Sequence, residues 1–324
     1  MFDVKQLGRV GILMGGYSSE RDISLKSGKA VLKALQEEGL NCVPLDIRHQ
    51  EMDKIKESIL QAQIDLAFIA LHGKLGEDGI IQSILEQCDI PYTGSGVKAS
   101  QIAINKIQTQ KLLQENSMPI AACLTVQKDD SGNAIREIEK KLNYPVVVKP
   151  PCEGSSIGIS LAKDNVSLQK ALETAWEYSP EILVEQYIKG RELTVGILGE
   201  AALPIVEIIH QGGFFDFQAK YQSQTTKYIV PAPLTVCLAQ EIRKTALQAH
   251  RILGCEDLSR IDFILGEDER YYVLEVNTIP GFTSSSLLPK AAKETGIHFN
   301  QLCLKLIYCA YGKKKTNKNL SINY

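Results

Sequence analysis

The chain has 324 residues, of which 44% are apolar, with 36 basic and 38 acidic side chains and a formal net charge of −2. Charges this evenly balanced argue against a protein-wide field for nucleic acid or an acidic membrane. The longest apolar-rich stretch, Ile64 to Leu71, contains Asp65 and is too short to span a bilayer, and residues 1–3 do not open a secretory signal. We expect a soluble, cytoplasmic protein that binds neither nucleic acid nor membranes.

The first third of the chain alternates between strand and helix patterns. Its apolar spacing predicts strands over Arg9–Met14, Asn41–Leu45 and Leu66–Leu71, and helices over Arg21–Glu38 and Ile80–Gln87. Strands separated by helices indicate an α/β domain with a parallel sheet, whose functional loops follow the carboxyl ends of the strands. The loops Gly15–Glu20 and His72–Gly79 lie at such ends and are candidate site loops.

The remaining two thirds mix helices and strands in an α+β pattern. We expect helices over Ala99–Glu115, Leu168–Tyr178 and Leu238–Leu253, strands over Pro145–Lys149, Glu181–Gln186 and Glu192–Leu198, and a hairpin of Ser259–Leu265 with Tyr271–Val276. The basic segment Lys313–Lys318 predicts a frayed end. The eight cysteines are scattered singly and predict reduced, mostly buried thiols.

Four polar residues in the predicted hairpin form the strongest local pattern for chemistry. Residues i and i+2 of a strand share a face, so Arg260 lies beside Asp262, and Glu275 beside Asn277. Pairing of the two strands brings Asp262 near Glu275. Two carboxylates and an amide oxygen suit Mg²⁺, and the planar, permanently charged fork of Arg260 suits phosphate. The opposite, core-facing side is expected to hold Ile261, Phe263, Leu274 and Val276.

The hairpin alone is equally consistent with an exposed edge whose charges form ordinary surface pairs, each worth about 0–1 kcal/mol. A second segment favours phosphate binding. Lys149 ends a strand and is followed by a glycine- and serine-rich loop, Pro151–Gly158, whose N–H groups and hydroxyls suit a flap over phosphates. This loop, the flap, would by itself also fit a plain surface turn. The conjunction of flap, Lys149, Lys106 and hairpin favours phosphate binding over these alternatives.

Seven segments carry motifs that occur together: Gly15–Leu25, Leu71–Gly79, Pro91–Ser95, Lys149–Gly158, Ala219–Tyr221, Gly254–Asp262 and Leu274–Ser284. In this order they resemble the ATP-grasp carboxylate–amine ligases and, within them, the D-alanine–D-alanine ligase family. The ordered set is far more specific than any single segment. The chain departs from the family in carrying Cys152 in the flap, and in Phe215 and Phe217, where the family often has tyrosines.

The resemblance implies an ATP-grasp fold, in which a Rossmann-like parallel-sheet domain is followed by two ATP-grasp subdomains. We expect an N-terminal α/β substrate domain over residues 1–100, a central ATP-grasp subdomain over 101–184, a C-terminal ATP-grasp subdomain over 185–312 and a basic polar tail over 313–324. Members of the family are commonly dimers, so the resemblance also implies a homodimer.

The resemblance further implies that ATP lies between the central and C-terminal subdomains. Lys106 and Lys149 would contact its phosphates, Glu185 the adenine and Glu192 the ribose hydroxyls. Two Mg²⁺ or Mn²⁺ ions would bridge the phosphates, held by Asp262, Glu275 and Asn277. The nucleotide site would be completed by Ser155, Ser156 and Lys220.

The implied reaction joins two D-alanine molecules through an acyl phosphate, releasing ADP and phosphate, for peptidoglycan precursor synthesis. Arg260 and the backbone N–H of Gly281 would stabilise the tetrahedral oxyanion. Glu20 would bind the ammonium group of the first D-alanine, with His72 nearby. Ser286 would bind the carboxylate of the second D-alanine.

A glycine-led segment, Gly212–Gln224, corresponds to the family's lid. It carries Lys220, which would contact nucleotide and substrate, and Tyr221, which would bond Ser155 and, through it, Glu20. Closure excludes water, and a charge pair at 4 Å then strengthens from about 1 to about 4 kcal/mol as the effective dielectric falls to about 20. Family members that make D-alanyl-D-lactate tend to carry a lid histidine, which this segment lacks, although His210 lies just before it.

Alternatives remain for single residues and for the whole protein. Glu20 would also suit a helix N-terminus, where the dipole favours an acid by about 0.3–1 kcal/mol, and a lone histidine such as His72 is usually structural. The protein could instead be a related ATP-grasp ligase acting on D-lactate or D-serine, or a nucleotide-binding regulator without turnover. The complete set of hairpin residues argues against the regulator.

Overall fold

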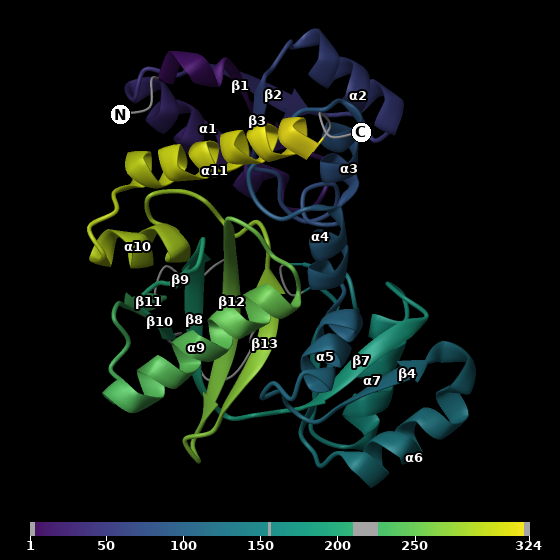
Figure 1. Cartoon of the computed structure of the whole chain (residues 1–324). Helices are drawn as coiled ribbons and strands as arrows, with labels where there is room; N and C mark the ends of the chain where they lie inside the picture. Colours follow the sequence, from purple (N-terminus) through teal and green to yellow (C-terminus); the bar gives the residue numbers. More distant parts are fainter. Residues whose placement is uncertain (1–3, 155–156, 210–225, 321–324) are drawn as a thin grey trace.

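Three β-sheets, each covered by helices, form the framework of the chain (Figure 1). The computed structural model describes residues 4–154, 157–209 and 226–320. A parallel sheet comes first along the chain, and two antiparallel sheets follow. This order confirms the predicted combination of an α/β part with an α+β part.

The first sheet is parallel, with strand order β2-β1-β3. Side chains alternate between its faces, so Val10 and Ile12 of β1 pack into one core while Leu13 packs into another. Helix α2 has no counterpart among the predicted elements, because Ile55 and Ile59 are its only buried residues. The elements are η1 (Val4–Leu7), β1 (Arg9–Gly15), α1 (Arg21–Glu37), β2 (Asn41–Ile47), α2 (Met52–Gln61), β3 (Leu66–Ile69) and α3 (Ile80–Gln87).

The second sheet is antiparallel, with strand order β4-β7-β5-β6. Helix α7 begins with a capping box in which Asp164 and Ser167 satisfy each other's backbone N–H groups, and it packs on β5 and β6. The predicted domain boundary between residues 184 and 185 falls within β7. The elements are β4 (Cys123–Gln127), η2 (Lys128–Asp130), α6 (Ser131–Lys141), β5 (Val146–Lys149), β6 (Ser160–Ala162), α7 (Asn165–Ala175) and β7 (Glu181–Gln186).

The third sheet has the order β11-β10-β8-β12-β13, with β9 added to β8. Helix α9 covers one of its faces (Figure 1), where Val195 and Ile261 pack with Ile242 of the helix. Polar side chains on the opposite face of the third sheet line a cleft. The elements are β8 (Gly190–Leu198), β9 (Ala201–Ala202), β10 (Val206–Ile209), β11 (Lys227–Ile229), α9 (Val236–Ile252), β12 (Leu258–Gly266), β13 (Tyr271–Asn277) and α10 (Leu287–Glu294).

The single helix predicted over Ala99–Glu115 is wrong, because the chain forms two helices there. Helix α4 (Val97–Ile104) ends at Asn105, whose extended backbone starts α5 (Lys106–Glu115). The Asn105 side chain accepts a hydrogen bond from the backbone N–H of Gln108 at 3.1 Å, which is N-cap geometry. The break makes Lys106 the first residue of a helix.

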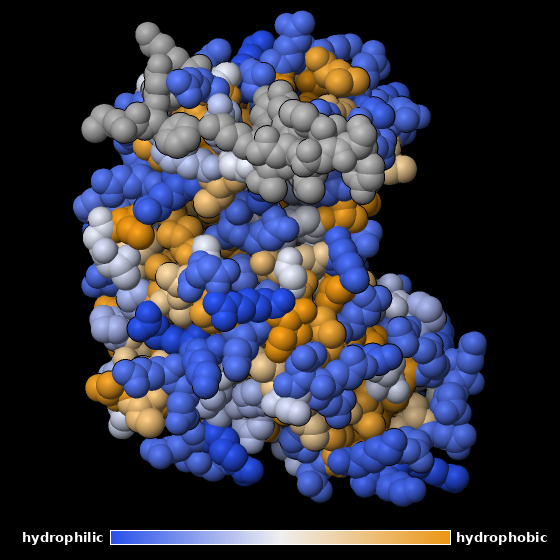
Figure 2. Space-filling view, viewed as in Figure 1, coloured by the Kyte–Doolittle hydropathy of each residue, from blue (hydrophilic) through white to orange (hydrophobic). Residues whose placement is uncertain are grey.

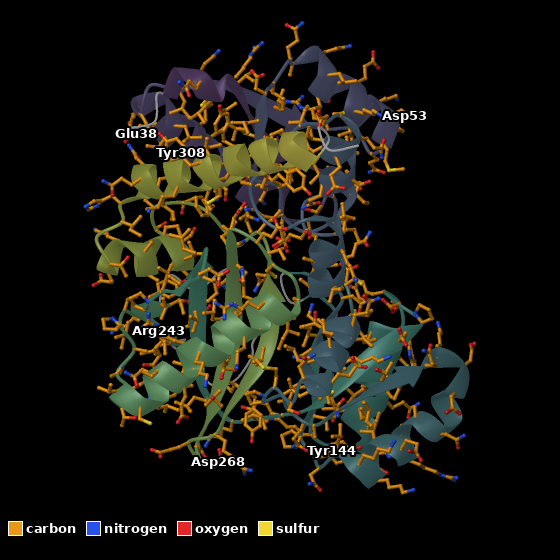
Figure 3. The ribbon with its side chains drawn as sticks, viewed as in Figure 1. Glu38, Asp53, Tyr144, Arg243, Asp268 and Tyr308 are labelled. Atoms are coloured by element: carbon orange, nitrogen blue, oxygen red, sulfur yellow. The ribbon has the colours of Figure 1, made fainter. Side chains whose placement is uncertain are left out.

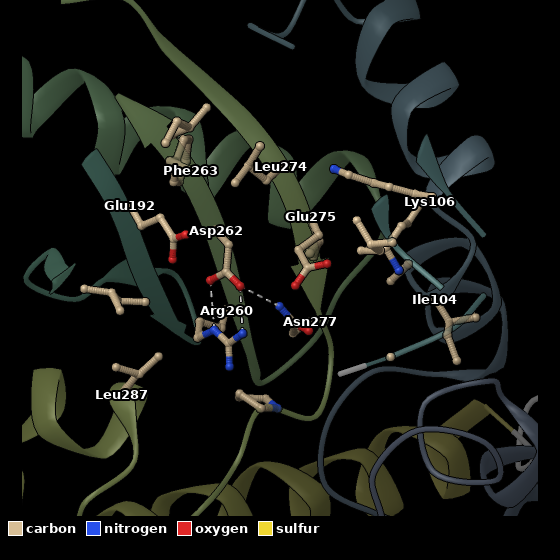
Figure 4. A pocket seen from close by; sticks show the side chains of 18 of the residues that line it. Ile104, Lys106, Glu192, Arg260, Asp262, Phe263, Leu274, Glu275, Asn277 and Leu287 are labelled. Carbon is tan, nitrogen blue, oxygen red and sulfur yellow. Dashed lines mark hydrogen bonds and ion pairs between the residues drawn. The ribbon is translucent and has the colours of Figure 1, made fainter. Parts of the chain in front are cut away.

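A β-bulge corrects the predicted core face of the hairpin. Asp262 pairs with Glu275, as predicted, but the next residue, Phe263, pairs with Val273, so Leu274 is an extra residue on β13. Val273 therefore enters the core, and Leu274 lines the cleft instead (Figure 4). The displaced carbonyl of Leu274 accepts a hydrogen bond from the side chain of Gln110 at 3.0 Å.

The C-terminal helix α11 (Phe299–Leu320) corrects the prediction of a frayed basic end, because the helix continues through that segment. Lys313 Nζ lies 2.8 Å from both Glu256 Oε2 and Asp257 Oδ2, and donates to the carbonyl of Gly94 at 2.7 Å. Helix α11 packs along α1. Figure 3 labels Tyr308 on α11 and Glu38 just after the end of α1. Helix α11 is thus tied to α1 of the first sheet's domain.

On the face seen in Figure 2, hydrophilic side chains predominate among the coloured residues, and apolar side chains lie between them in small groups. Within the described ranges, no helix combines the length and apolar character needed to cross a membrane. All eight cysteines are free thiols, but of these only Cys255 and Cys303 are buried. The expectation of mostly buried thiols was therefore wrong.

The buried His250 of α9 predicts a pH dependence of stability. Its Nδ1 lies 2.7 Å from Ser259 Oγ, and burial lowers the pKa of His250 from its ordinary value of 6.5. The unfolded chain then binds a proton more readily than the folded chain, so the free energy of unfolding should fall as the pH drops below 6.5. Urea unfolding at a series of pH values should show this slope, and His250→Gln should reduce it. An equal reduction in His298→Gln, an exposed control, would contradict the assignment.

Candidate active site

A cleft of about 460 Å³ lies between the second and third sheets, and loops of the first sheet close one end of it. Its walls come from elements far apart in the sequence, among them α5, β5, β7, β8 and the β12–β13 hairpin. Eleven predicted site residues line this one cleft. They are Glu20, His72, Lys106, Lys149, Glu185, Glu192, Arg260, Asp262, Glu275, Asn277 and Gly281.

The hairpin presents its polar residues on one face toward the cleft (Figure 4). Asp262 lies directly opposite Glu275 in the register of β12 and β13, as predicted. Arg260 donates from Nε and Nη2 to the two carboxylate oxygens of Asp262, at 2.9 and 2.7 Å. Asn277 Nδ2 donates to Asp262 Oδ2 at 3.2 Å. These contacts connect Arg260, Asp262 and Asn277, and Glu275 lies beside them in the register of the hairpin.

Arg260 is a fixed positive charge within this group. Burial acts to lower the pKa of Arg260, but the neighbouring carboxylates, Asp262 first, outweigh it and raise the pKa. Glu275 and Glu77 act in the same direction. Its guanidinium therefore stays charged at every pH at which the protein is folded, as a group that binds anionic oxygen requires.

The donor set of the hairpin fits a divalent cation that prefers oxygen ligands. Asp262 and Glu275 supply carboxylates, and Asn277 keeps its Oδ1 available because its Nδ2 is the atom bonded to Asp262. Among the described residues, no three His, Cys, Asp or Glu side chains gather as a metal cluster. A cation here would therefore need the amide oxygen of Asn277 as its third protein ligand.

Thr194 belongs to this group and was missed by the sequence analysis. It lies opposite Asp262 in the pairing of β8 with β12, and its hydroxyl contacts Asp262 Oδ1 at 2.5 Å. The available signal was the spacing, because Thr194 follows Glu192 by two residues and so shares its strand face.

Two lysines enter the cleft from the side of the second sheet. Lys149 at the end of β5 forms a partly buried ion pair with Glu185 of the neighbouring strand β7. Lys106 Nζ donates to the carbonyl of Glu153 in the flap at 2.8 Å. Because Lys106 is the first residue of α5, the positive end of the helix dipole adds to its charge. Apolar side chains suited to a flat base line the same region: Ala121, Val147, Ile159 and Leu274.

Glu20 lies at the end of the cleft formed by the first sheet. It occupies the N-cap position of α1, but its side chain makes no capping hydrogen bond. A Cβ added at Gly73 would lie 2.7 Å from Glu20 Oε2, and one added at Gly154 would lie 3.1 Å from it. The carboxylate thus rests against two glycines, one in the β3 loop and one in the flap, and this placement favours a binding role over simple capping.

His72 is buried, and both of its ring nitrogens have partners. Nδ1 lies 3.0 Å from the carbonyl oxygen of Ile279, and Nε2 lies 3.0 Å from Ser27 Oγ. Glu77, a cleft residue that the sequence analysis did not single out although it lies in one of the seven motifs, is 3.6 Å from Nδ1.

Ser286 stands at the N-cap of α10, next to the cleft residue Leu287. Its Oγ accepts a hydrogen bond from the N–H of Thr283 at 3.0 Å. Four other predicted residues lie outside the described ranges, namely Ser155, Ser156, Lys220 and Tyr221. The proposed link from Tyr221 through Ser155 to Glu20, and the lid that carries it, therefore remain predictions.

An ion pair joins the flap to the loop after β3, and the sequence analysis did not predict it. Lys74 Nζ lies 3.2 Å from Glu153 Oε1, while the backbone carbonyl of Glu153 is bonded to Lys106. Glu153 thus connects the two loops that flank Glu20. Its only sequence signal was an acidic residue within the glycine- and serine-rich flap.

A parallel sheet followed by two antiparallel sheets that enclose a lysine- and carboxylate-lined cleft defines an ATP-grasp enzyme. Family models described as the N-terminus and C-terminus of D-ala D-ala ligase match residues 9–58 and 46–95, and residues 112–308. A D-alanine–D-alanine ligase from Geobacter sulfurreducens is 44% identical over 308 residues, which are 95% of this chain and 95% of the relative. The chain belongs to the D-alanine–D-alanine ligase family.

Solved structures agree with this assignment. The crystal structure of D-alanine–D-alanine ligase from Bacillus anthracis complexed with ATP has a TM-score of 0.81 and 32% identity, covering 96% of this chain and 99% of that one. The VanG D-Ala:D-Ser ligase from Enterococcus faecalis has the same TM-score at 29% identity, covering 94% and 99%. The fold is therefore shared by relatives that differ in their named second substrate.

Proposed function

We propose that this protein ligates two D-alanine molecules to D-alanyl-D-alanine with ATP, releasing ADP and phosphate, for peptidoglycan precursor synthesis. The observation that carries the proposal is the meeting, in one cleft, of the Glu20 carboxylate with the Arg260–Asp262–Glu275–Asn277 group. The first is suited to an amino-acid ammonium group, and the second to nucleotide phosphates. Family membership and 44% identity over 95% of a D-alanine–D-alanine ligase support it.

The nucleotide would lie along the wall between the two antiparallel sheets. Lys149 and Lys106 would contact its phosphates, Glu185 its adenine and Glu192 its ribose hydroxyls. Asp262, Glu275 and Asn277 would hold divalent cations, Mg²⁺ or Mn²⁺, which when bound offset the charge of the β- and γ-phosphates. Ser155, Ser156 and Lys220 would complete the nucleotide site from outside the described residues.

The reaction needs an activated carboxyl group, because a carboxylate is a poor electrophile. An oxygen of the first D-alanine carboxylate attacks the γ-phosphorus of ATP, the bond to the β-phosphate oxygen breaks, and an acyl phosphate and ADP result. The second D-alanine, once its ammonium group has lost a proton, attacks the acyl carbon through its amine. The nitrogen of the tetrahedral intermediate then releases a second proton, and inorganic phosphate leaves as the amide forms. Arg260 and the N–H of Gly281 would bind the oxyanion of that intermediate.

The chain's own groups would orient the two amino acids. Glu20 would hold the ammonium group of the first D-alanine, with His72 behind it. Ser286 would bind the carboxylate of the second. Tyr221, through Ser155, would join the lid to Glu20 and keep water away from the acyl phosphate.

Product analysis tests this function directly. Purified protein with ATP, Mg²⁺ and D-alanine should yield ADP, phosphate and D-alanyl-D-alanine in equal amounts, with little phosphate released when D-alanine is omitted. Substituting D-lactate or D-serine as the second substrate, and L-alanine as a control, defines the specificity. Phosphate release that does not depend on D-alanine, or a mixed product in preference to the dipeptide, would overturn the proposal.

The same family relationship supports a homodimer in the cytoplasm as part of the proposal. Light scattering combined with size-exclusion chromatography should give a mass near twice the 35.8 kDa of one chain. A mass of one chain at the concentration used in the activity assay would contradict the dimer without affecting the proposed reaction.

A further inference from the structure

We propose that Ser27 is a positioning residue for this reaction, acting through the ring of His72 and the loop that carries Gly281. The inference rests on the proposed function, because it concerns the N–H group assigned there to the oxyanion. Ser27 lies on α1, and its side chain is 1% exposed. It touches neither the hairpin carboxylates nor the nucleotide wall, so any effect on catalysis must pass through its neighbours.

Three hydrogen bonds connect Ser27 to the loop after β13. The backbone N–H of Phe282 donates to Ser27 Oγ at 3.2 Å, and Ser27 Oγ lies 3.0 Å from His72 Nε2. At the other side of the ring, His72 Nδ1 lies 3.0 Å from the carbonyl oxygen of Ile279. The three contacts run from Phe282 in the loop after β13 to Ser27 on α1, then to His72 in the loop after β3, and from His72 back to Ile279 in the loop after β13.

The chemistry of these partners determines where the protons lie. A carbonyl oxygen can only accept, so His72 Nδ1 must carry a hydrogen and donate it to Ile279. Since Ser27 Oγ already accepts from Phe282, its own hydrogen is free to point at Nε2, which accepts it as the unprotonated nitrogen. Of the two neutral tautomers of His72, the one protonated at Nδ1 is therefore the one that fits these partners. A ring protonated at Nε2 would force the Ser27 hydrogen out of this contact.

The two ends of the chain of contacts bracket Gly281. Ile279 lies two residues before it and Phe282 one residue after it, so the peptide that presents the Gly281 N–H is held from both sides. The Phe282 side chain is anchored as well, with ring centroids 5.6 Å from both Phe68 and Phe299. The ring contacts fix the position of the Phe282 side chain. Ser27 in addition orients the backbone of the loop, because it accepts a hydrogen bond from the Phe282 N–H group.

A serine within a helix lowers the stability of that helix, and the positioning role explains why Ser27 is nevertheless present in α1. Serine is a poorer helix former than alanine because its hydroxyl competes for backbone hydrogen bonds. Beside it, Gly28 allows α1 to approach β1 closely, since an added Cβ would lie 2.5 Å from the side chain of Met14. This close approach brings the Ser27 hydroxyl within reach of both His72 and Phe282.

Kinetics of Ser27→Ala separate positioning from simple stability. We expect kcat for dipeptide formation to fall about tenfold, since loss of one well-placed oxyanion donor costs about 10²–10³ and a displaced donor should cost part of that. The KM for ATP should stay within about twofold, because the nucleotide wall is untouched. Ser24→Ala is the matched control: Ser24 is equally buried on α1 and bonds Gly15 and Ala70, but not the Gly281 loop. An unchanged kcat in Ser27→Ala, or an equal loss in both variants, overturns the inference.

The tautomer of His72 gives a readout that does not depend on ligase activity. The protein can be labelled with ¹⁵N-histidine and its ring nitrogens observed by NMR. The chain has five histidines, and the signals that disappear in His72→Gln are those of His72. We expect the wild-type ring to be protonated at Nδ1 and unprotonated at Nε2, and Ser27→Ala to shift the Nε2 signal while Ser24→Ala does not. A wild-type ring protonated at Nε2 would refute the arrangement. Inactivity of the wild type with the expected tautomer would instead point to failure of the proposed function.

Discussion

Asp262→Asn is expected to reduce D-alanine-dependent phosphate release by at least about 100-fold. Loss of residues that merely support metal ligands costs about 10–100-fold, and a residue assigned as a ligand should cost more. Asp262 also carries the charge that faces both nitrogens of the Arg260 fork and accepts the bonds of Thr194 and Asn277. Asparagine keeps the shape of the side chain but removes this charge, so both the cation site and Arg260 are affected. Steady-state assays of phosphate and ADP measure the effect.

Asp268→Asn provides the matched control within the same hairpin. Asp268 pairs with Arg270 two residues later at 2.6 Å, as Asp262 pairs with Arg260, but it lies in the exposed turn (Figure 3). The control should lose little activity, because an exposed ion pair contributes about 0–1 kcal/mol. Circular dichroism should show that both variants are folded. A folded Asp262→Asn protein with wild-type turnover would remove the hairpin from the proposed mechanism.

Glu20→Gln should lower kcat/KM for D-alanine by about 10- to 100-fold while nucleotide affinity stays unchanged. A hydrogen bond to a charged group is worth about 1.5–3 kcal/mol, which corresponds to that range. The glutamine is nearly isosteric, so the carboxylate charge is the main thing removed from its place between Gly73 and Gly154. Measuring phosphate release against D-alanine at saturating ATP, together with ADP binding by calorimetry, separates the two substrates.

Asp22→Asn distinguishes substrate binding from a helix-dipole effect at Glu20. Asp22 is an exposed acid in the first turn of the same helix, α1, and it does not line the cleft. If Glu20 acted only through the dipole, both variants would lose similar stability, about 0.3–1 kcal/mol, and neither would lose activity selectively. We expect only Glu20→Gln to affect D-alanine.

Local patterns were sufficient to predict the hairpin and its polar face. Alternation along a strand is a property of neighbouring residues, so the sequence alone places Arg260, Asp262 and Glu275 together. It does not predict the bulge at Leu274, because the bulge depends on how β13 pairs with β12 and on Gln110 beneath it. The break at Asn105 had a local signal, an N-cap residue, that the continuous apolar spacing concealed.

Contacts between segments far apart in the sequence could not be predicted from local patterns. Ser27 and Phe282 are separated by 255 residues, and neither stands in a segment whose spacing suggests a polar contact. The pairing of Lys149 with Glu185 likewise follows from the adjacency of β5 and β7. Eleven residues that line the cleft were therefore predictable from motifs, but the contacts between distant segments were not.

The docking of α11 on α1 has a consequence for how the chain reaches its native state during synthesis. Leu302, Leu306 and Ile307 of α11 belong to the same core as Val10 and Ile12 of β1. The ribosome makes the first sheet early, yet the residues that complete one face of it emerge only after the whole of the third sheet. Helix α1 covers part of that apolar face early, through Val31 and Leu35, but the rest stays exposed until α11 emerges, which makes the nascent N-terminal segment a candidate for chaperone binding until then.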